Sequence, residues 1–172
     1  MKVAVLILAT LAAAVLLVLL VGALLPRAHE ASRAALFRRR PGELYAAIRD
    51  FSAMPTWRTS LERVDVLPPR EGCTCFREIS THQSLSYVVL EDKPPGRLVT
   101  KIADEGLPFG GTWTYEIVAE PDGSRLRITE RGEVRNVFFR FMARFVFGYT
   151  GTMDAYLRDL GGKFGESVAP GP

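Results

Sequence analysis

Hydrophobic and polar residues follow three different patterns along the chain. Residues 3–25 are uncharged and almost wholly apolar, residues 61–134 alternate with a period of two, and residues 136–160 repeat every three to four positions. A period of two places alternate side chains on opposite faces of a strand, whereas spacings of three and four place them on one face of a helix. The pattern therefore predicts an apolar N-terminal segment, a set of strands and a C-terminal helix.

The N-terminal apolar stretch is long enough to cross a membrane. At ~1.5 Å per residue, a helix over residues 3–25 spans the ~30 Å hydrocarbon core of a bilayer. The alternative is a cleaved signal peptide, with Lys2 as its basic start and Val21-Gly22-Ala23 as its cleavage site. The stretch exceeds the roughly 7–15 apolar residues usual in a signal peptide, which favours an uncleaved, single-pass transmembrane helix.

Positive charges beside the apolar stretch bear on its orientation. Lys2 precedes it, whereas Arg27, Arg33 and residues 38–40 follow it. Counting these charges favours a soluble domain on the cytoplasmic side, because positively charged flanks stay in the cytoplasm. If the later arginines belong to a folded strand, they say less about insertion. Residues 26–32 are expected to form a linker to the soluble domain.

The middle of the chain is predicted to form an antiparallel sheet of about seven strands. Residues 125–131 alternate most clearly, with Leu126 and Ile128 beside Glu130 on one face and arginines on the other. Proline- and glycine-containing turns separate the alternating segments, and short connections of this kind are typical of antiparallel meanders. The predicted strands cover residues 34–39, 61–67, 73–81, 85–91, 98–104, 112–119 and 125–134, and short helices cover residues 41–51 and 53–57.

The C-terminal segment, residues 136–160, is predicted to be one long amphipathic helix. Asn136 can cap its start, and Gly161-Gly162 can end it, because glycine adopts the left-handed conformation without a Cβ clash. Gly148 and Gly151 are the points at which the helix can yield. Its apolar stripe requires a large apolar surface, which one face of the sheet supplies. The stripe consists of Phe138, Phe141, Met142, Phe145, Tyr149, Met153, Tyr156 and Leu160.

Charge and motif content narrow the possible functions. The net charge is +3 and the arginines are mixed with acidic residues, so the sequence lacks the clustered basic face of a nucleic-acid-binding protein. Cys73 and Cys75 share one face of a predicted strand, where a disulfide would be strained, and two thiols alone do not form a zinc site. His29 and His82 lie outside the predicted strands and are poor candidates for a catalytic base. No metal, cofactor or nucleic-acid partner is expected.

Several short motifs occur in a characteristic order with these elements. They are Phe76-Arg77-Glu78, Pro94-Pro95-Gly96-Arg97-Leu98-Val99, Pro108-Phe109-Gly110-Gly111-Thr112-Trp113-Thr114-Tyr115 and Ile128-Thr129-Glu130-Arg131-Gly132. Together with the phenylalanine-rich helix, they resemble the START-like (SRPBCC) superfamily, in particular its polyketide cyclase/dehydrase and lipid transport families. The resemblance implies an α+β helix-grip fold over residues 33–165, in which a curved antiparallel sheet wraps around the C-terminal helix and encloses a cavity. Residues 166–172 are expected to form a disordered tail.

A cavity between sheet and helix predicts which side chains meet a ligand. Glu130 and Glu78 are the candidate acid–base residues, because a carboxylate turned into an apolar cavity is suited to proton transfer. In the alternative interpretation, Glu130 lies near a strand end and pairs with an arginine such as Arg77 or Arg131. Phe139 and Phe147 lie off the apolar stripe, where they can touch lipid or the rim of the cavity. The expected lining consists of Trp57, Phe76, Tyr87, Trp113, Tyr115, Ile128, Glu130, Phe138, Phe141, Met142, Phe145 and Tyr149.

Three functions are compatible with these patterns. The first is non-catalytic binding or transport of an apolar, lipid-like small molecule by a domain anchored in a membrane. The second is an enzyme of the cyclase or dehydrase kind that uses a cavity glutamate and a tyrosine. The third is an interaction module whose core is closed. The fold alone does not determine which of these functions is correct. A cavity large enough for a small molecule would favour the first two functions, and a filled core would favour the third.

Overall fold

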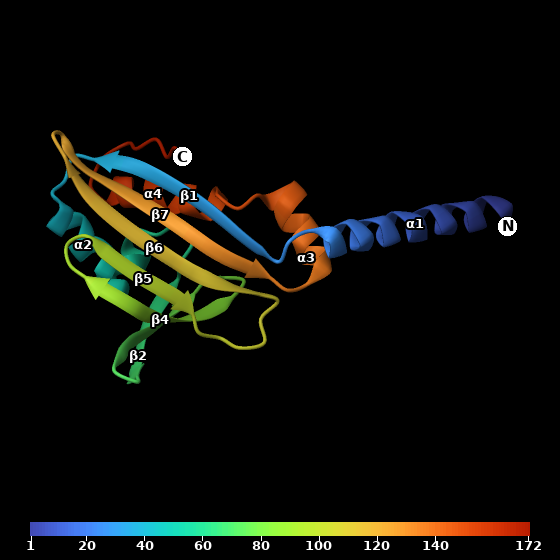
Figure 1. Cartoon of the computed structure of the whole chain (residues 1–172), viewed down its shortest axis with the longest axis horizontal. Coiled ribbons are helices and arrows are strands. Elements are labelled where there is room, and N and C mark those ends of the chain that lie inside the picture. Colours follow the sequence, from blue (N-terminus) through green and yellow to red (C-terminus); the bar gives the residue numbers. More distant parts are fainter.

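The chain forms one long N-terminal helix followed by an α+β domain (Figure 1). The computed structural model describes residues 1–172. The helices are α1 (Lys2–Leu24), α2 (Pro41–Arg49), the 3-10 helix η1 (Phe51–Thr56), α3 (Val137–Met142), the π-helical turn η2 (Ala143–Phe147) and α4 (Gly151–Lys163). The strands are β1 (Ala28–Phe37), β2 (Arg63–Arg70), β3 (Cys73–Ile79), β4 (Ser84–Lys93), β5 (Arg97–Ile102), β6 (Phe109–Glu120) and β7 (Gly123–Val134).

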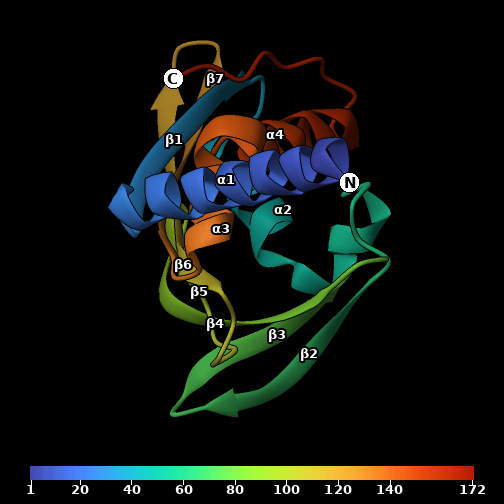
Figure 2. The ribbon, with the colours of Figure 1, turned by 90° about the vertical axis from the view of Figure 1, so that its right-hand side faces the viewer.

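All seven strands belong to a single antiparallel sheet in the order β1-β7-β6-β5-β4-β3-β2. The six strands that follow η1 pair in a meander, and β1 closes the order by pairing with β7. The sheet curves around α4 and α2, which lie on its concave side (Figure 2). The predicted helix-grip fold is therefore confirmed.

The core lies between the concave face of the sheet and α4. Met153, Tyr156, Leu157 and Leu160 repeat at helical spacing along α4 and are almost completely buried. Opposite them, the inward residues of the strands alternate with exposed ones, as Leu126 and Ile128 do on β7. Burial of each large apolar side chain stabilises the fold by about 1.5–3 kcal/mol, so this contact holds α4 against the concave face of the sheet.

The C-terminal helix is broken, and the prediction of one helix over residues 136–160 is wrong. α3 and η2 end at Gly148, whose φ of 70° and ψ of −179° are accessible almost only to glycine. The chain then restarts as α4, which continues through Gly161-Gly162 to Lys163 instead of stopping there. The break divides the apolar stripe, because the α4 part faces the core whereas Phe138 and Phe145 are exposed.

The two segments that flank the domain are more ordered than the pattern indicated. β1 begins at Ala28, so the linker expected over residues 26–32 is shorter. The tail after α4 lies along β1, where Gly171 pairs with Ala34 and the Glu166 carboxylate accepts a hydrogen bond from the Arg38 backbone N–H. Gly161 permits this path, since a Cβ there would lie 2.8 Å from the Glu166 carbonyl oxygen. The tail thus folds with the domain.

α1 is apolar along its whole exposed length and makes its tertiary contact at its C-terminal end. It is long and apolar enough to cross a bilayer, either as an anchor or as a signal sequence. Gly22 packs against the backbone of Val137 so closely that a Cβ would lie 2.1 Å from the Val137 carbonyl oxygen. The Arg140 guanidinium donates a hydrogen bond of 2.8 Å to the Leu25 carbonyl oxygen and one of 3.5 Å to that of Ala23. An arginine therefore caps the carbonyl end of the apolar helix.

Candidate functional site

A cavity of about 460 Å³ lies between the sheet and the α3–α4 segment. Antiparallel pairing gathers the start of β1, the end of β7, the start of β6, the end of β5 and the β3–β4 turn at one end of the sheet. This is the end at which α1 joins the domain (Figure 1). Lining residues that belong to it are His29, Ser80, Gln83, Ile102, Phe109 and Val134.

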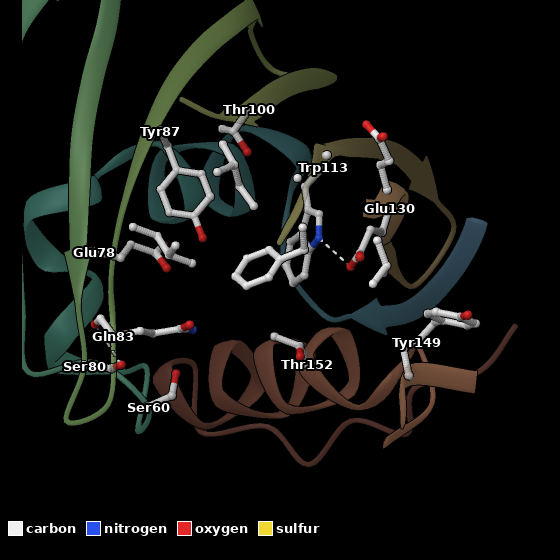
Figure 3. Close-up of a pocket in the computed structure, with 18 of the residues that line it drawn as sticks. Ser60, Glu78, Ser80, Gln83, Tyr87, Thr100, Trp113, Glu130, Tyr149 and Thr152 are labelled. Atoms are coloured by element: carbon white, nitrogen blue, oxygen red, sulfur yellow. Dashed lines mark hydrogen bonds between the residues drawn. The ribbon is translucent and has the colours of Figure 1, made fainter. Parts of the chain in front are cut away.

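Aromatic side chains from successive strands form the inner wall of the cavity (Figure 3). Phe76 stacks on Tyr87 from the neighbouring strand, with ring centroids 5.1 Å apart, and Trp113 lies 6.0 Å from Tyr115. These residues project to the same face because the β3–β4 register pairs Phe76 directly with Tyr87, and Trp113 and Tyr115 are two positions apart on β6. The wall is apolar in its rings and carries hydroxyl groups at its edge.

Arg58 and Glu78 form a buried ion pair at one side of the cavity. A guanidinium nitrogen of Arg58 contacts a Glu78 carboxylate oxygen, and only 9% and 13% of the two side chains are exposed. The guanidinium also lies over the ring of Tyr156, 5.1 Å from its centroid. Burial is the largest single effect and lowers the pKa of Arg58, but the charge of Glu78, the neighbouring Tyr156 and Tyr115 and the hydrogen bond to Glu78 together outweigh it, so the pKa is raised. The arginine therefore stays charged inside the wall.

The tyrosines beside this pair keep their protons. Burial, and then the nearby Glu78 carboxylate, raise the pKa of Tyr87 far above its usual value. Burial likewise raises the pKa of Tyr115, although the positive charge of Arg58 acts in the opposite direction. Thr100, which is also buried, adds a third hydroxyl to the same wall (Figure 3). This side of the cavity thus offers neutral hydroxyl groups to a bound molecule.

Glu130 is the centre of a second polar group on the β1–β7–β6 side. Its carboxylate accepts a hydrogen bond of 2.8 Å from the indole N–H of Trp113 (Figure 3). It also lies 3.1 Å from Nε2 of His29. The imidazole stacks on the ring of Tyr149 at 4.0 Å and occupies the space left by the missing side chain of Gly132. Its Nδ1 is buried without a hydrogen-bond partner. When Nε2–H donates to Glu130, Nδ1 is a free acceptor.

The structure brings some of the expected site residues together and separates others. Seven of them line the cavity, namely Phe76, Glu78, Tyr87, Trp113, Tyr115, Glu130 and Tyr149. Trp57 and Ile128 are buried in the core and do not line it, because Trp57 packs edge-on against Tyr156. Phe138, Phe141, Met142 and Phe145 also lie outside the lining. The break at Gly148 turns the other face of α3 and η2 inward, so Phe139 and Phe147 line the cavity in their place.

The cavity residues that were not recognised from the sequence include His29 and Arg58, the partners of Glu130 and Glu78. His29 belongs to β1, which begins earlier than the alternation indicated, and its partner Glu130 is 101 positions away. Arg58 lies in the loop after η1, where no periodic signal exists. The partners of Glu130 are accordingly His29 and Trp113 and not Arg77 or Arg131, since Arg131 pairs with Glu30 on the other face of the sheet. Only the β1–β7 register could have indicated the histidine.

A family model places the chain among known proteins. Residues 28–164 match the family described as polyketide cyclase / dehydrase and lipid transport. No curated protein matches the sequence.

Solved structures share the fold at low sequence identity. A START superfamily protein from Mycobacterium smegmatis is 17% identical, with a TM-score of 0.62 over 78% of this chain and 96% of that protein. The ZhuI aromatase/cyclase from Streptomyces sp. R1128 is 9% identical, with a TM-score of 0.60 over 79% and 93%. The di-domain aromatase/cyclase StfQ of the steffimycin biosynthetic pathway is 12% identical, with a TM-score of 0.65 over 77% of this chain. The chain spans 50% of the length of StfQ.

Proposed function

Since the chain belongs to the polyketide cyclase / dehydrase and lipid transport family, we propose that its cavity binds an apolar, lipid-like small molecule and that α1 anchors the domain in a membrane. The cavity carries this proposal. Its volume of about 460 Å³ falls within the range of about 300–1,000 Å³ usual for small-molecule sites. A closed core, as an interaction module would have, does not fit a void of this size.

The distribution of polar groups favours a ligand with a long apolar part and a polar end. The rings of Phe76, Tyr87 and Trp113 supply apolar contact area. The hydroxyl groups of Tyr115 and Thr100 lie on the wall that also carries Arg58. The guanidinium is already paired with Glu78, so it can assist binding of a neutral carbonyl or hydroxyl group without requiring an anionic ligand.

The contacts of α1 support its role as an anchor. Arg140 is 6% exposed, and the partners of its guanidinium are backbone carbonyls at the end of α1. Cleavage after Ala23 would remove Gly22 from its contact with Val137 and would disturb these partners. A buried guanidinium without partners is costly, so the folded domain fits an intact N-terminus better than a processed one.

Ligand binding can be tested by filling the cavity. Thr152 lines the cavity from α4, and its side chain points into it (Figure 3), whereas the exposed Ala155 on the same helix does not line it. The full chain in a mild detergent should bind a fluorescent fatty acid saturably, and mass spectrometry should detect retained apolar molecules. Thr152→Trp should weaken binding by at least about tenfold, because it removes the space for several buried CH₂ groups at ~0.8 kcal/mol each. The matched control Ala155→Trp should bind as the wild type does, and equal affinities of the two variants would contradict the proposal.

A second candidate function is an enzyme of the cyclase or dehydrase kind, and the His29–Glu130 pair favours it. The Glu130 carboxylate, as a base beside the free acceptor Nδ1 of His29, can remove a proton from a ligand carbon that lies between two carbonyl groups. This proton transfer starts an intramolecular condensation. Trp113 holds Glu130 in place, as a catalytic carboxylate requires. The test incubates the full chain with a poly-β-ketone and follows cyclised product by mass spectrometry. Glu130→Gln should abolish turnover while retaining fatty-acid binding, and turnover that survives in this variant would exclude the assignment.

A further inference from the structure

We propose that α3 and η2 lie in the interfacial layer of the membrane beside α1, so that the cavity opens directly into the bilayer. The inference rests on the proposed anchoring by α1 and adds the surface that contacts lipid and the route by which the ligand enters. Three independent features of residues 137–147 carry it: exposed apolar side chains, fixed depth beside α1, and a shared wall with the cavity.

The α3–η2 segment exposes more large apolar side chains than any other part of the domain. The exposed fractions are 47% for Phe138, 59% for Phe145, 59% for Val146 and 67% for Phe147. Isolated exposed apolar residues are common, but a contiguous aromatic group of this kind marks a surface that is covered in the working protein. The side chains are adjacent along the chain, and Phe141 packs on Phe145 with ring centroids 5.0 Å apart.

The contact between α1 and α3 sets the depth of this group in a bilayer. α1 has 23 residues and is about 35 Å long at ~1.5 Å per residue, so it uses its whole length to cross the hydrocarbon core and reaches the interface at its C-terminal end. α3 is fixed at that end by the Gly22–Val137 contact and by the hydrogen bonds from Arg140. The two helices lie side by side in both views (Figures 1 and 2). The aromatic group is therefore held where acyl chains meet headgroups.

The charges around the group fit a lipid surface better than a protein surface. Residues 134–153 contain three arginines and no acidic residue. Arg144 is exposed beside the aromatic side chains, where it can reach anionic headgroups while the rings enter the acyl region. Arg135 is also exposed, but it pairs with Glu133 and donates a hydrogen bond to the Leu107 carbonyl oxygen. The exposed apolar surface of α1 is continuous with this segment, so one bilayer covers both.

The same segment forms part of the cavity rim. Phe139, Phe147 and Gly148 line the cavity and are themselves exposed, which places them at its opening. Ser60 and Gln83 are the exposed lining residues on the opposite side. One side of the opening is thus aromatic and faces the membrane, and the other is polar. An apolar molecule can pass from the acyl region to the cavity along the aromatic side without crossing water.

The insertion can be measured with a fluorescent probe and spin-labelled lipid. A full-chain variant with Cys73→Ala and Cys75→Ala receives a single cysteine by Phe145→Cys, or by Val118→Cys as the control. Val118 is 62% exposed on β6, away from α3. Each chain is labelled with an environment-sensitive fluorophore and placed, one chain per disc, in nanodiscs of phosphatidylcholine and phosphatidylglycerol. A phosphatidylcholine with a doxyl group near the headgroup should quench the probe at position 145 and leave the probe at position 118 unquenched.

Equal quenching at the two positions would overturn the proposal. A shift of the emission of the 145 probe to that of an apolar environment, seen only when several chains share a disc, would also overturn the proposal. A second copy of the chain, and not lipid, would then cover the segment. Phe145→Glu with Val146→Glu supplies a second readout, since neither residue lines the cavity. Transfer of the fluorescent fatty acid from nanodiscs should slow by about tenfold, while its affinity in detergent stays unchanged. If the wild type does not bind the fluorescent fatty acid in detergent, the proposed function is refuted. If it binds the fatty acid but the probe at position 145 is not quenched, only the insertion is refuted.

Discussion

Removal of the Glu78 charge should destabilise the fold strongly, because Arg58 would remain in the wall without its counter-ion. Both side chains are more than four-fifths buried, so solvent screening of the pair is small. Breaking a buried ion pair on one side typically costs about 3–5 kcal/mol. We expect the lower end, about 3 kcal/mol, because Glu78 borders the cavity and the guanidinium keeps its contact with the ring of Tyr156. For a chain of this length, that corresponds to a fall in Tm of about 6–12 °C.

The assay is thermal unfolding of the full chain in a mild detergent, followed by near-ultraviolet circular dichroism, which reports the packing of aromatic side chains. Glu78→Gln preserves the shape of the side chain and removes its charge. Replacing both partners, with Arg58→Met and Glu78→Met, should recover most of the loss, since no unpaired charge then remains. Glu120→Gln is the matched control, because it breaks the exposed pair with Arg125 and should leave Tm unchanged.

Two results would refute this reasoning. If Glu78→Gln unfolds at the wild-type temperature, the guanidinium is solvated within the cavity and the pair is not a buried one. If the double variant is as unstable as the single variant, the loss comes from packing and not from the uncompensated charge. Either outcome would also weaken the argument that Arg58 and the neighbouring hydroxyls form a fixed polar wall for the ligand.

Two further changes test other parts of the structure. Burial alone raises the pKa of Asp92, but hydrogen bonds from Tyr45 and Arg49 lower it below its usual value, so the stability that it contributes should be lost as the pH falls below about 4. Asp92→Asn should remove this part of the acid sensitivity in Tm measured across that pH range, and an unchanged profile would count against the hydrogen bonds. Gly148→Ala should cost about 1–3 kcal/mol in denaturant unfolding, because φ at this position is 70°. Gly162→Ala, inside α4 with open space around it, should be neutral or stabilising, and equal losses would argue against strain at the break.

The sheet could be predicted from the sequence because its information is local. Alternation places Leu126, Ile128 and Glu130 on one face of a strand, and the meander order follows from the short turns. On β3, alternation left two registers open, and the structure has Phe76 and Glu78 at the cavity and Arg77 exposed. The assignments on β7 need only neighbouring residues and the rule that a slip by one position exchanges the two faces of a strand.

The remainder of the site depends on contacts that no local pattern contains. Gly148 could be identified as a point at which the helix can yield, but the apolar spacing continues across it, so the sequence did not indicate that the helix ends there. The break decides which phenylalanines face the cavity. His29 reaches Glu130 only through the β1–β7 register, across 101 positions. Arg58 follows a 3-10 helix and finds Glu78 through tertiary packing. Each of these residues is placed by long-range pairing, which sequence periodicity does not report.

The segment before the break at Gly148, α3 and η2, forms one structural unit with the N-terminal helix α1. α3 has six residues, too few to be stable in isolation, so its position depends on what it packs against. The main partner is α1, through Gly22 and the capping by Arg140, and α3 makes far fewer contacts with the sheet. The glycine conformation at 148 then uncouples this segment from α4, which the sheet grips. The rim of the cavity formed by α3 and η2 is thus attached to α1, whereas the wall opposite it belongs to the sheet. Movement of α1 relative to the domain would therefore change the opening without disturbing the core.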